Sequence, residues 1–203
     1  PDTLEGEAEV RYESAGDEIF GKLDLTGGSD KFAWHLDAFD RETGDYSIPG
    51  FAEIDPHEDD EQGTLSGSSI NTSNISAGFS IVDDKGYFGA SFQKLENFYG
   101  VPGHGHAEEE DHDDEHEEEG IHEAEEELVN LDVEMDRFQV AGEWFTPVKG
   151  ITTVKFRGAY TDYQHQEIEN GEIGTTFTNE TTETRFDIHH DEFDGWHGCL
   201  LYT

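Results

Sequence analysis

The sequence predicts an all-β protein, an antiparallel up-and-down sheet of about nine strands that forms part of a transmembrane β-barrel. Three observations predict it: apolar and polar residues alternate with a period of two, the connections between alternating segments are by turns short and long, and aromatic residues gather near the ends of these segments. Alternation gives a strand one apolar and one polar face. Tight turns on one side and long loops on the other are typical of barrels that cross outer membranes.

The alternation is clearest in segment 32–39, where Phe32, Trp34 and Leu36 share one face, while His35 and Asp37 share the other. Several segments have the ~9–11 residues that a tilted strand needs to cross a bilayer. The same reasoning, applied along the chain, predicts strands at about residues 4–13, 18–27, 31–41, 74–83, 86–97, 129–145, 150–165, 173–190 and 194–202.

The phase of the alternation slips within segment 129–145. Leu131 and Val133 occupy odd positions, whereas Phe138 and Val140 occupy even ones. A β-bulge near 136–137 would place all four on one face, because a bulge inserts one extra residue into a strand. We therefore expect a bulge there.

The connections and the aromatic residues favour a barrel over a sandwich. Connections at 27–30, 83–86, 147–150 and 190–194 are short, those at 42–73 and 100–128 are long, and 166–172 is intermediate. A soluble sandwich has no reason to gather its long loops on one side. Aromatic residues near strand ends are typical of the girdles of a barrel at the membrane interfaces, and packing in a soluble core is the alternative. The residues concerned are Phe98, Tyr99, Trp144, Phe145, Tyr160, Tyr163, Trp196 and Tyr202.

The formal net charge of −39 excludes nucleic acid as a partner, because phosphates need Lys and Arg, and it attracts cations. The acidic residues outside 104–127 are explained equally well by a generally acidic surface, as in salt-adapted proteins. The single cysteine, Cys199, excludes an internal disulfide framework, and its apolar surroundings predict a buried thiol. No Walker, G-x-S-x-G, H-E-x-x-H or dinucleotide motif occurs, so we expect no enzyme.

Segment 104–127 (HGHAEEEDHDDEHEEEGIHEAEEE) predicts divalent-metal binding. Imidazole suits zinc, copper and nickel, and carboxylates also bind zinc. The spacing lacks the regularity of a structural zinc site, so it indicates several exchangeable sites. A solvated acidic loop with incidental histidines is the alternative. The histidines expected to bind metal are His104, His106, His112, His116 and His122.

A second group of histidines lies on the polar faces of predicted strands. Most residues of this kind are structural rather than ligands. The phase of the alternation points these histidines and their acidic companions into the barrel: His35, His165, His189, His197, Asp24, Asp37 and Asp187.

Three stretches resemble the barrel of TonB-dependent receptors, namely 45–53 (DYSIPGFAE), 97–106 (NFYGVPGHGH) and 158–180 (GAYTDYQHQEIENGEIGTTFTNE). The similarity is closest to the zinc-uptake branch, in which a YGVPGH stretch opens a His-rich extracellular loop. The resemblance covers nearly the whole chain and keeps the order of loops and turns.

The resemblance implies a location in the bacterial outer membrane and a barrel of about 22 strands with a plug in its lumen. Extracellular loops capture the ligand, and a periplasmic TonB protein pulls on the plug to release cargo inward. Zinc would be transported cargo and not a catalytic cofactor. The capture role falls on the five loop histidines together with nearby acids such as Asp111, Asp113 and Glu115.

The sequence departs from that family in lacking a plug domain and a TonB box, and about nine strands cannot close such a barrel. We therefore expect residues 1–203 to be part of a receptor barrel domain, with the His-, Asp- and Glu-rich extracellular loop at about 100–128. TonB would act through the plug of the parent receptor. Two alternatives remain: a receptor of the same family for a siderophore or another organic ligand, and a soluble acidic metal-binding β-protein.

Overall fold

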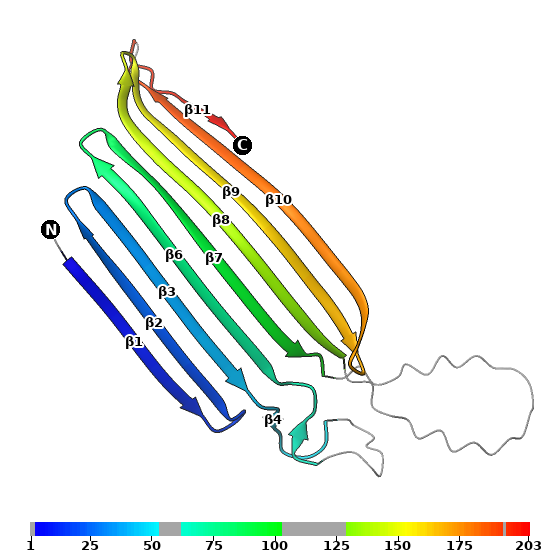
Figure 1. The fold of residues 1–203 in the computed structure, drawn as a ribbon. Helices are drawn as coiled ribbons and strands as arrows, with labels where there is room; N and C mark the ends of the chain where they lie inside the picture. The colour runs from blue at the N-terminus through cyan, green and yellow to red at the C-terminus, as the bar shows by residue number, and fades with distance from the viewer. Residues whose placement is uncertain (1–2, 53–61, 103–128, 193) are drawn as a thin grey trace, which may run out of the picture.

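The computed structural model describes residues 3–52, 62–102, 129–192 and 194–203. These residues form one antiparallel sheet of nine strands in the order β1-β2-β3-β6-β7-β8-β9-β10-β11, and the sheet is not closed (Figure 1). Its strands are β1 (Thr3–Glu13), β2 (Glu18–Ser29), β3 (Phe32–Thr43), β6 (Ile70–Asp83), β7 (Gly86–Gly100), β8 (Val129–Val148), β9 (Ile151–Glu169), β10 (Glu172–His190) and β11 (Cys199–Tyr202). The predicted all-β antiparallel class is confirmed.

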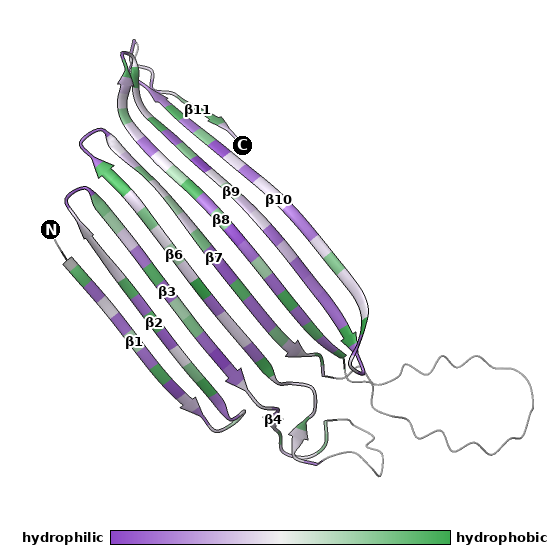
Figure 2. Ribbon diagram, in the orientation of Figure 1, coloured by the Kyte–Doolittle hydropathy of each residue, from purple (hydrophilic) through white to green (hydrophobic). Residues whose placement is uncertain are grey.

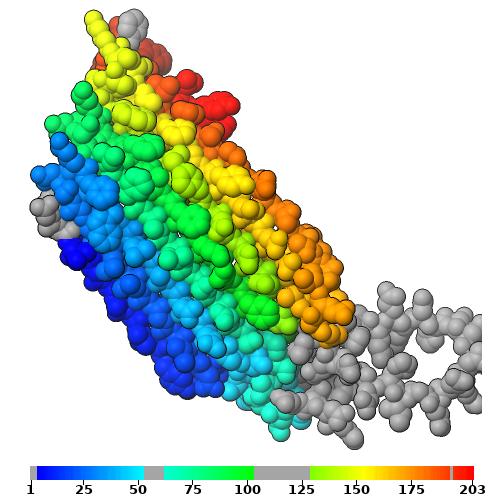
Figure 3. Space-filling model, viewed as in Figure 1, coloured from blue at the N-terminus to red at the C-terminus, as the bar shows by residue number. Residues whose placement is uncertain are grey.

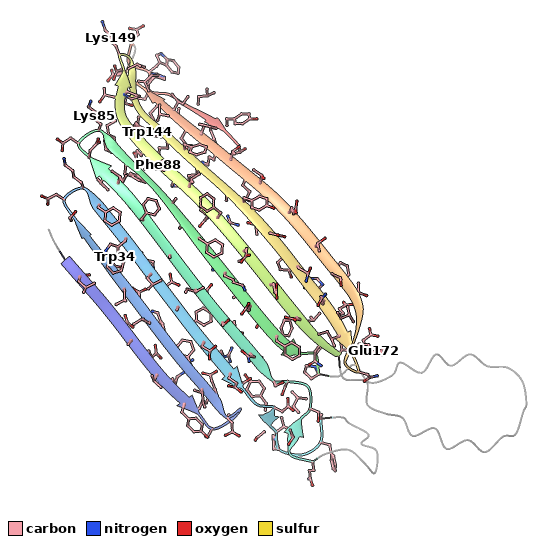
Figure 4. All side chains as sticks on the ribbon, viewed as in Figure 1. Trp34, Lys85, Phe88, Trp144, Lys149 and Glu172 are labelled. Atoms are coloured by element: carbon pink, nitrogen blue, oxygen red, sulfur yellow. The ribbon has the colours of Figure 1, made fainter. Side chains whose placement is uncertain are left out.

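Turns at 30–31, 84–85 and 149–150 lie at one edge of the sheet, which we call the short-turn edge. At the opposite edge, the long-loop edge, connections 44–69 and 101–128 join neighbouring strands. Connection 44–69 also contains the small hairpin β4 (Tyr46–Ser47) and β5 (Thr64–Leu65), which the sequence did not predict. In Figure 4, Lys85 and Lys149 mark the first edge and Glu172 marks the second.

Two predicted connections differ from the structure. The connection expected at 166–172 is a two-residue turn at the long-loop edge, because β9 and β10 extend to Glu169 and Glu172. Asn170 and Gly171 have φ of 50° and 84°, the left-handed pair that suits a tight hairpin. At the other edge, the strand expected from residue 194 begins only at Cys199.

Register assigns each side chain to a face, because residues paired across antiparallel strands lie on the same side of a sheet. We call the face that carries Phe32, Trp34 and Leu36 face A, and the face that carries His35 and Asp37 face B. Leu36 on β3, for example, pairs with Leu25 on β2 and with Ala77 on β6. The same rule extends both faces from β1 to β11.

The β-bulge predicted near 136–137 is wrong. The pairing of β8 with β7 and with β9 runs without a shift from Asn130 to Trp144. The apolar residues themselves change sides: Phe138 and Val140 lie on face A, whereas Leu131 and Val133 lie on face B. The phase slip therefore marks a change in which face carries the apolar residues, and the backbone stays regular.

Face A carries a band of large apolar residues that ends at a sharp border. Phe92, Phe138 and Tyr160 occupy one cross-strand row, and the next row toward the long-loop edge holds Lys94, Asp136, Asp162 and Glu180. Phe98, Ile168 and Ile173 are large apolar residues of this face beyond the border. The alternation of apolar and polar residues along the strands is visible in Figure 2.

The border is level across β7, β8 and β9, but from β1 to β10 it runs obliquely to the strands. The last large apolar residue of the band is Tyr12 on β1 and Phe186 on β10, yet the register carried from Tyr12 across the sheet reaches β10 at Thr176, ten residues from Phe186. Ten residues with a rise of about 3.3 Å each give a displacement of about 33 Å along the strands. The seven steps between neighbouring strands, of about 4.8 Å each, give a nearly equal distance across the sheet. The strands are therefore inclined by about 40–45° to the normal of the border.

The band is not covered by a second layer within the described residues. Val129 and Val133 are their only buried apolar side chains. Phe79, Phe88, Phe138 and Trp144 are 40–49% exposed, together with many other large apolar groups. Figure 3 likewise shows the strands side by side in chain order on the face in view, with no other described element over them. No helix among the described residues is long and apolar enough to span a membrane.

Candidate functional site: the polar face of the sheet

The metal ligands predicted from the sequence lie outside the described residues. This applies to His104, His106, His112, His116, His122, Asp111, Asp113 and Glu115. Within the described residues there is no group of three or more His, Cys, Asp or Glu side chains able to hold a metal ion. The metal site therefore stays a prediction from sequence.

Most of the histidines and acidic residues that the sequence predicted to point into the barrel lie on face B. His35, His165 and His189 lie on this face, as do Asp24, Asp37 and Asp187. His197 does not, because it precedes β11 in the connection at the short-turn edge. Its side chain is 77% exposed, and Nε2 lies 3.6 Å from Oε2 of Glu192.

A chain of hydrogen bonds crosses face B from β2 to β7. His35 Nε2 lies 2.9 Å from Oδ1 of Asp37, and its Nδ1 lies 2.9 Å from the Thr26 hydroxyl. The Asn74 amide donates to Oδ2 of Asp37 at 3.3 Å and accepts from Nε2 of Gln93 at 2.9 Å. An ionised carboxylate only accepts, so Nε2 of His35 carries a proton. In a neutral ring, Nδ1 then accepts from Thr26.

Asp24 lies directly opposite Asp37 across the β2–β3 ladder, and two carboxylates in this position repel each other. His35 Nε2 reaches both, at 2.9 Å from Asp37 and 4.0 Å from Asp24. Asn74 is only 7% exposed, and no buried side-chain nitrogen or oxygen among the described residues lacks a hydrogen-bond partner, so Asn74 and its partners form a satisfied polar layer.

Face B also has a hollow of about 690 Å³ near its centre. Small residues form its floor because they leave room above the backbone: Ala33, Gly78, Ser80, Gly89, Ser91, Ala141 and Ala159. Thr26 and His35 lie on one side of the hollow, and three arginines, Arg137, Arg157 and Arg185, lie on the other. The sequence analysis missed this arrangement because it depends on seven strands, β2, β3 and β6 to β10, coming together.

Cations are concentrated on face B. Of the eleven Lys and Arg residues, Lys31, Lys85 and Lys149 lie at the short turns, and Lys94 lies on face A just beyond the border of the band. The other seven lie on face B: Arg11, Lys22, Arg41, Arg137, Lys155, Arg157 and Arg185. In each strand these seven residues alternate in step with the polar residues, so the sequence could have predicted that they lie on the polar face.

Most of the cations on face B are paired. Lys155 Nζ lies 3.1 Å from Oε1 of Glu143, its direct cross-strand neighbour. Arg185 binds the largely buried carboxylate of Asp187 through Nε and Nη2, at distances of 3.0–3.3 Å. Of these four residues Arg185 lines the hollow, and its pair with Asp187 fixes the position of its guanidinium group there.

Glu18 holds the first three strands together at the long-loop edge of face B. It is 5% exposed and accepts hydrogen bonds from Arg11 on β1, at 2.8 and 3.1 Å, and from Arg41 on β3, at 2.8 Å. These hydrogen bonds favour the ionised form and hold the pKa of Glu18 below its usual value. The Arg11 guanidinium also lies 4.6 Å from the centre of the Phe20 ring.

A partly apolar cluster occupies face B near the long-loop edge. Val133 is 9% exposed and pairs with His165 across the β8–β9 ladder. The His165 ring lies 4.6 Å from that of Phe177, and its Nδ1 lies 3.1 Å from the Tyr163 hydroxyl. These contacts favour a structural role for His165 over a ligand role.

Cys199 differs from its prediction. The thiol is exposed and not buried, because β11 pairs only along β10 and nothing among the described residues covers it. Its Sγ lies 3.7 Å from Nε2 of His189, the residue directly opposite on β10.

No model of a known protein family matches the chain. The geometry on its own defines an antiparallel sheet with one exposed apolar band and one polar, hydrogen-bonded face. The family assignment is therefore argued as a proposal.

Proposed function

We propose that this chain is part of the barrel wall of a bacterial outer-membrane TonB-dependent receptor for a divalent metal, with zinc as the cargo. In this proposal face A meets lipid, and face B meets the aqueous lumen. The observation that carries the proposal is the uncovered apolar band of face A with its charged border at Lys94, Asp136, Asp162 and Glu180.

The slope of the border supports the membrane assignment. Strands of transmembrane barrels tilt by about 35–45° from the membrane normal, so a bilayer boundary crosses the strands obliquely. The angle of about 40–45° obtained from Tyr12 and Phe186 agrees with that tilt. A soluble sheet has no planar boundary that would require such an oblique border.

The change of sides along β8 has the same explanation. Strands of outer-membrane barrels that extend beyond the bilayer meet water on their outer face. Asp132, Glu134 and Asp136 accordingly lie on face A beyond the border, where the outer face would be exposed to water. Leu131 and Val133 lie on face B, where they pack with residues of neighbouring strands.

The two outermost strands of the sheet, β1 and β11, support its being one portion of a larger barrel. β1 forms one edge, and β11 pairs with β10 only from Phe186 to His189. Unpaired backbone groups are not tolerated in hydrocarbon, so other strands of the barrel would have to pair with these edges.

The metal assignment rests on the sequence of segment 104–127, whose five histidines and acids suit zinc. The net charge of −39 would raise the local concentration of cations around the receptor. A soluble metal-buffering protein is less well supported, because it would need a second layer over Phe79, Phe88 and Phe138, and the described residues supply none.

The membrane part of the proposal is tested by fractionating cells that express the receptor of which this chain is proposed to be part. We expect it to remain in the outer-membrane pellet after an alkaline wash and to enter solution only with detergent. A monodisperse chain in detergent-free buffer would reject the barrel and favour the soluble alternative.

The cargo part is tested by calorimetric zinc titration of detergent-solubilised chain. Replacing His104, His106, His112, His116 and His122 with Ala should abolish most zinc binding. A matched control replaces three histidines of face B, His35, His165 and His189, and should bind zinc as the wild type does. Unchanged affinity in the five-histidine variant would reject the cargo assignment while leaving the barrel intact.

A further inference from the structure

We propose that the hollow on face B is a binding site for a small oxyanion ligand, one that carries carboxylate or phosphate groups. This proposal concerns face B alone and does not depend on the metal assignment or on the membrane.

The charge of the hollow is opposite to that of the chain. Three guanidinium groups, those of Arg137, Arg157 and Arg185, line it, against one carboxylate side chain, that of Glu183. The chain as a whole has a formal net charge of −39 and only eleven Lys and Arg residues. A cation-rich hollow in so acidic a chain selects an anion, because anions are repelled elsewhere.

Two of these arginines lie directly opposite each other. Arg157 on β9 pairs with Arg185 on β10, so both side chains leave the same face of adjacent strands. Like charges in this position destabilise a sheet. Asp187, which binds Arg185 and also interacts with the charge of Arg157, offsets part of this repulsion. An oxyanion bound between the two arginines would offset more of it, and a guanidinium can hold the oxyanion through two parallel hydrogen bonds.

Arg157 is the arginine left available. Arg137 is bound to Glu183 at 3.0 Å and to the Thr161 hydroxyl at 3.0 Å, and Arg185 is bound to Asp187. Arg157 is exposed and makes no ion pair within 4.0 Å in the described part of the chain. Its donors are therefore free for a ligand.

The size and floor of the hollow fit a small ligand. A volume of about 690 Å³ lies within the usual range of about 300–1,000 Å³ for small-molecule sites. Gly78 and Gly89 leave the backbone open at the floor, and a Cβ at Gly89 would lie 3.0 Å from the carbonyl oxygen of Phe79. Bulkier residues at these two positions would fill the hollow beside the arginines.

The experiment titrates citrate, inorganic phosphate and the neutral probe glucose into detergent-solubilised full chain, with the heat of binding as the readout. We expect citrate, phosphate or both to bind saturably at one site per chain, glucose to show no binding, and added NaCl to weaken the anion. Arg157→Gln should weaken the bound anion by about tenfold or more.

The matched control is Lys22→Gln, which removes one positive charge from face B outside the hollow and should leave affinity within about twofold of wild type. Circular dichroism checks that each variant is folded. If Arg157→Gln does not fold, Arg157→Lys replaces it, because Lys keeps the charge and loses the planar fork; the anion should again bind more weakly.

Three outcomes would overturn the proposal. The first is a folded wild-type chain that binds neither anion. The second is an Arg157 variant that binds the anion as tightly as the wild type. The third is binding of a Glu-rich peptide without binding of either small anion, which would assign the arginines to a polypeptide partner instead.

Discussion

Phe138 and Asp136 lie two residues apart on the same face of β8, and the border of the apolar band of face A passes between them. Each continues a row of its own kind across neighbouring strands, aromatic through Phe92 and Tyr160 and charged through Lys94 and Asp162. An apolar row and a charged row therefore meet along one line on this face. The predictions below follow from that division and from the polar layer on the opposite face.

An arginine on face A should be costly, and one on face B tolerated. Val140 lies within the band, whereas its neighbour Gln139 lies on face B. In phospholipid vesicles Val140→Arg should lower the free energy of unfolding by about 2–4 kcal/mol, because a charge would face hydrocarbon. Gln139→Arg should change it by less than about 0.5 kcal/mol. Urea unfolding followed by tryptophan fluorescence measures both, and equal effects would contradict the assignment of faces.

The Glu18 cluster should make stability depend on pH. Because Arg11 and Arg41 lower the pKa of Glu18 in the folded chain, its contribution is fully present above the pKa of the unfolded chain. It is lost as pH falls through the folded pKa. The stability gap between wild type and Glu18→Gln should thus be constant at neutral pH and narrow in acid.

The measurement for Glu18 is the urea midpoint of both chains from neutral pH to about pH 3. Glu9→Gln is the control, since Glu9 is 43% exposed and contacts Arg11 at 3.4 Å only. It should show a much smaller effect. A gap for Glu18→Gln that stays the same over the whole range would show that its charge does not stabilise the fold.

Asn74 should be the most sensitive member of the hydrogen-bond chain on face B. It joins Asp37 to Gln93 and is 7% exposed, so Asn74→Ala leaves both partners without their bond. The expected loss is about 1–3 kcal/mol in the free energy of unfolding. Asn71→Ala, at an exposed position of the same strand, should cost less than about 0.5 kcal/mol. Similar losses in the two variants would remove the special role of this layer.

Gly86 should not tolerate a side chain. Its φ is 141°, and a Cβ there would overlap the carbonyl group of Glu143 on β8. Gly86→Ala should therefore destabilise the sheet by at least about 2 kcal/mol, through backbone strain and a displaced strand. Gly21→Ala is the control, because a Cβ at that position meets nothing within 4 Å. Thermal unfolding measures the melting temperatures of the two variants, and equal melting temperatures would contradict this prediction.

The sequence by itself determined the strands and the sides of their residues. A period of two places Phe32, Trp34 and Leu36 on one face and His35 and Asp37 on the other, whatever the strand pairs with. The same pattern failed at residues 136–137, where the apolar residues of a regular strand change faces and so imitate a bulge. It also failed for His197, whose segment forms no strand.

Only the tertiary structure decided which residues of different strands share a row. Register depends on turn geometry and on neighbouring strands, and a shift of two residues would preserve every apolar and polar face while changing every cross-strand pair. The oblique course of the border from Tyr12 to Phe186, the opposition of Arg157 and Arg185, and the hollow above Gly89 all depend on that register. Periodicity along a strand determines the face to which each side chain points. Strand pairing determines which side chains of neighbouring strands lie beside it.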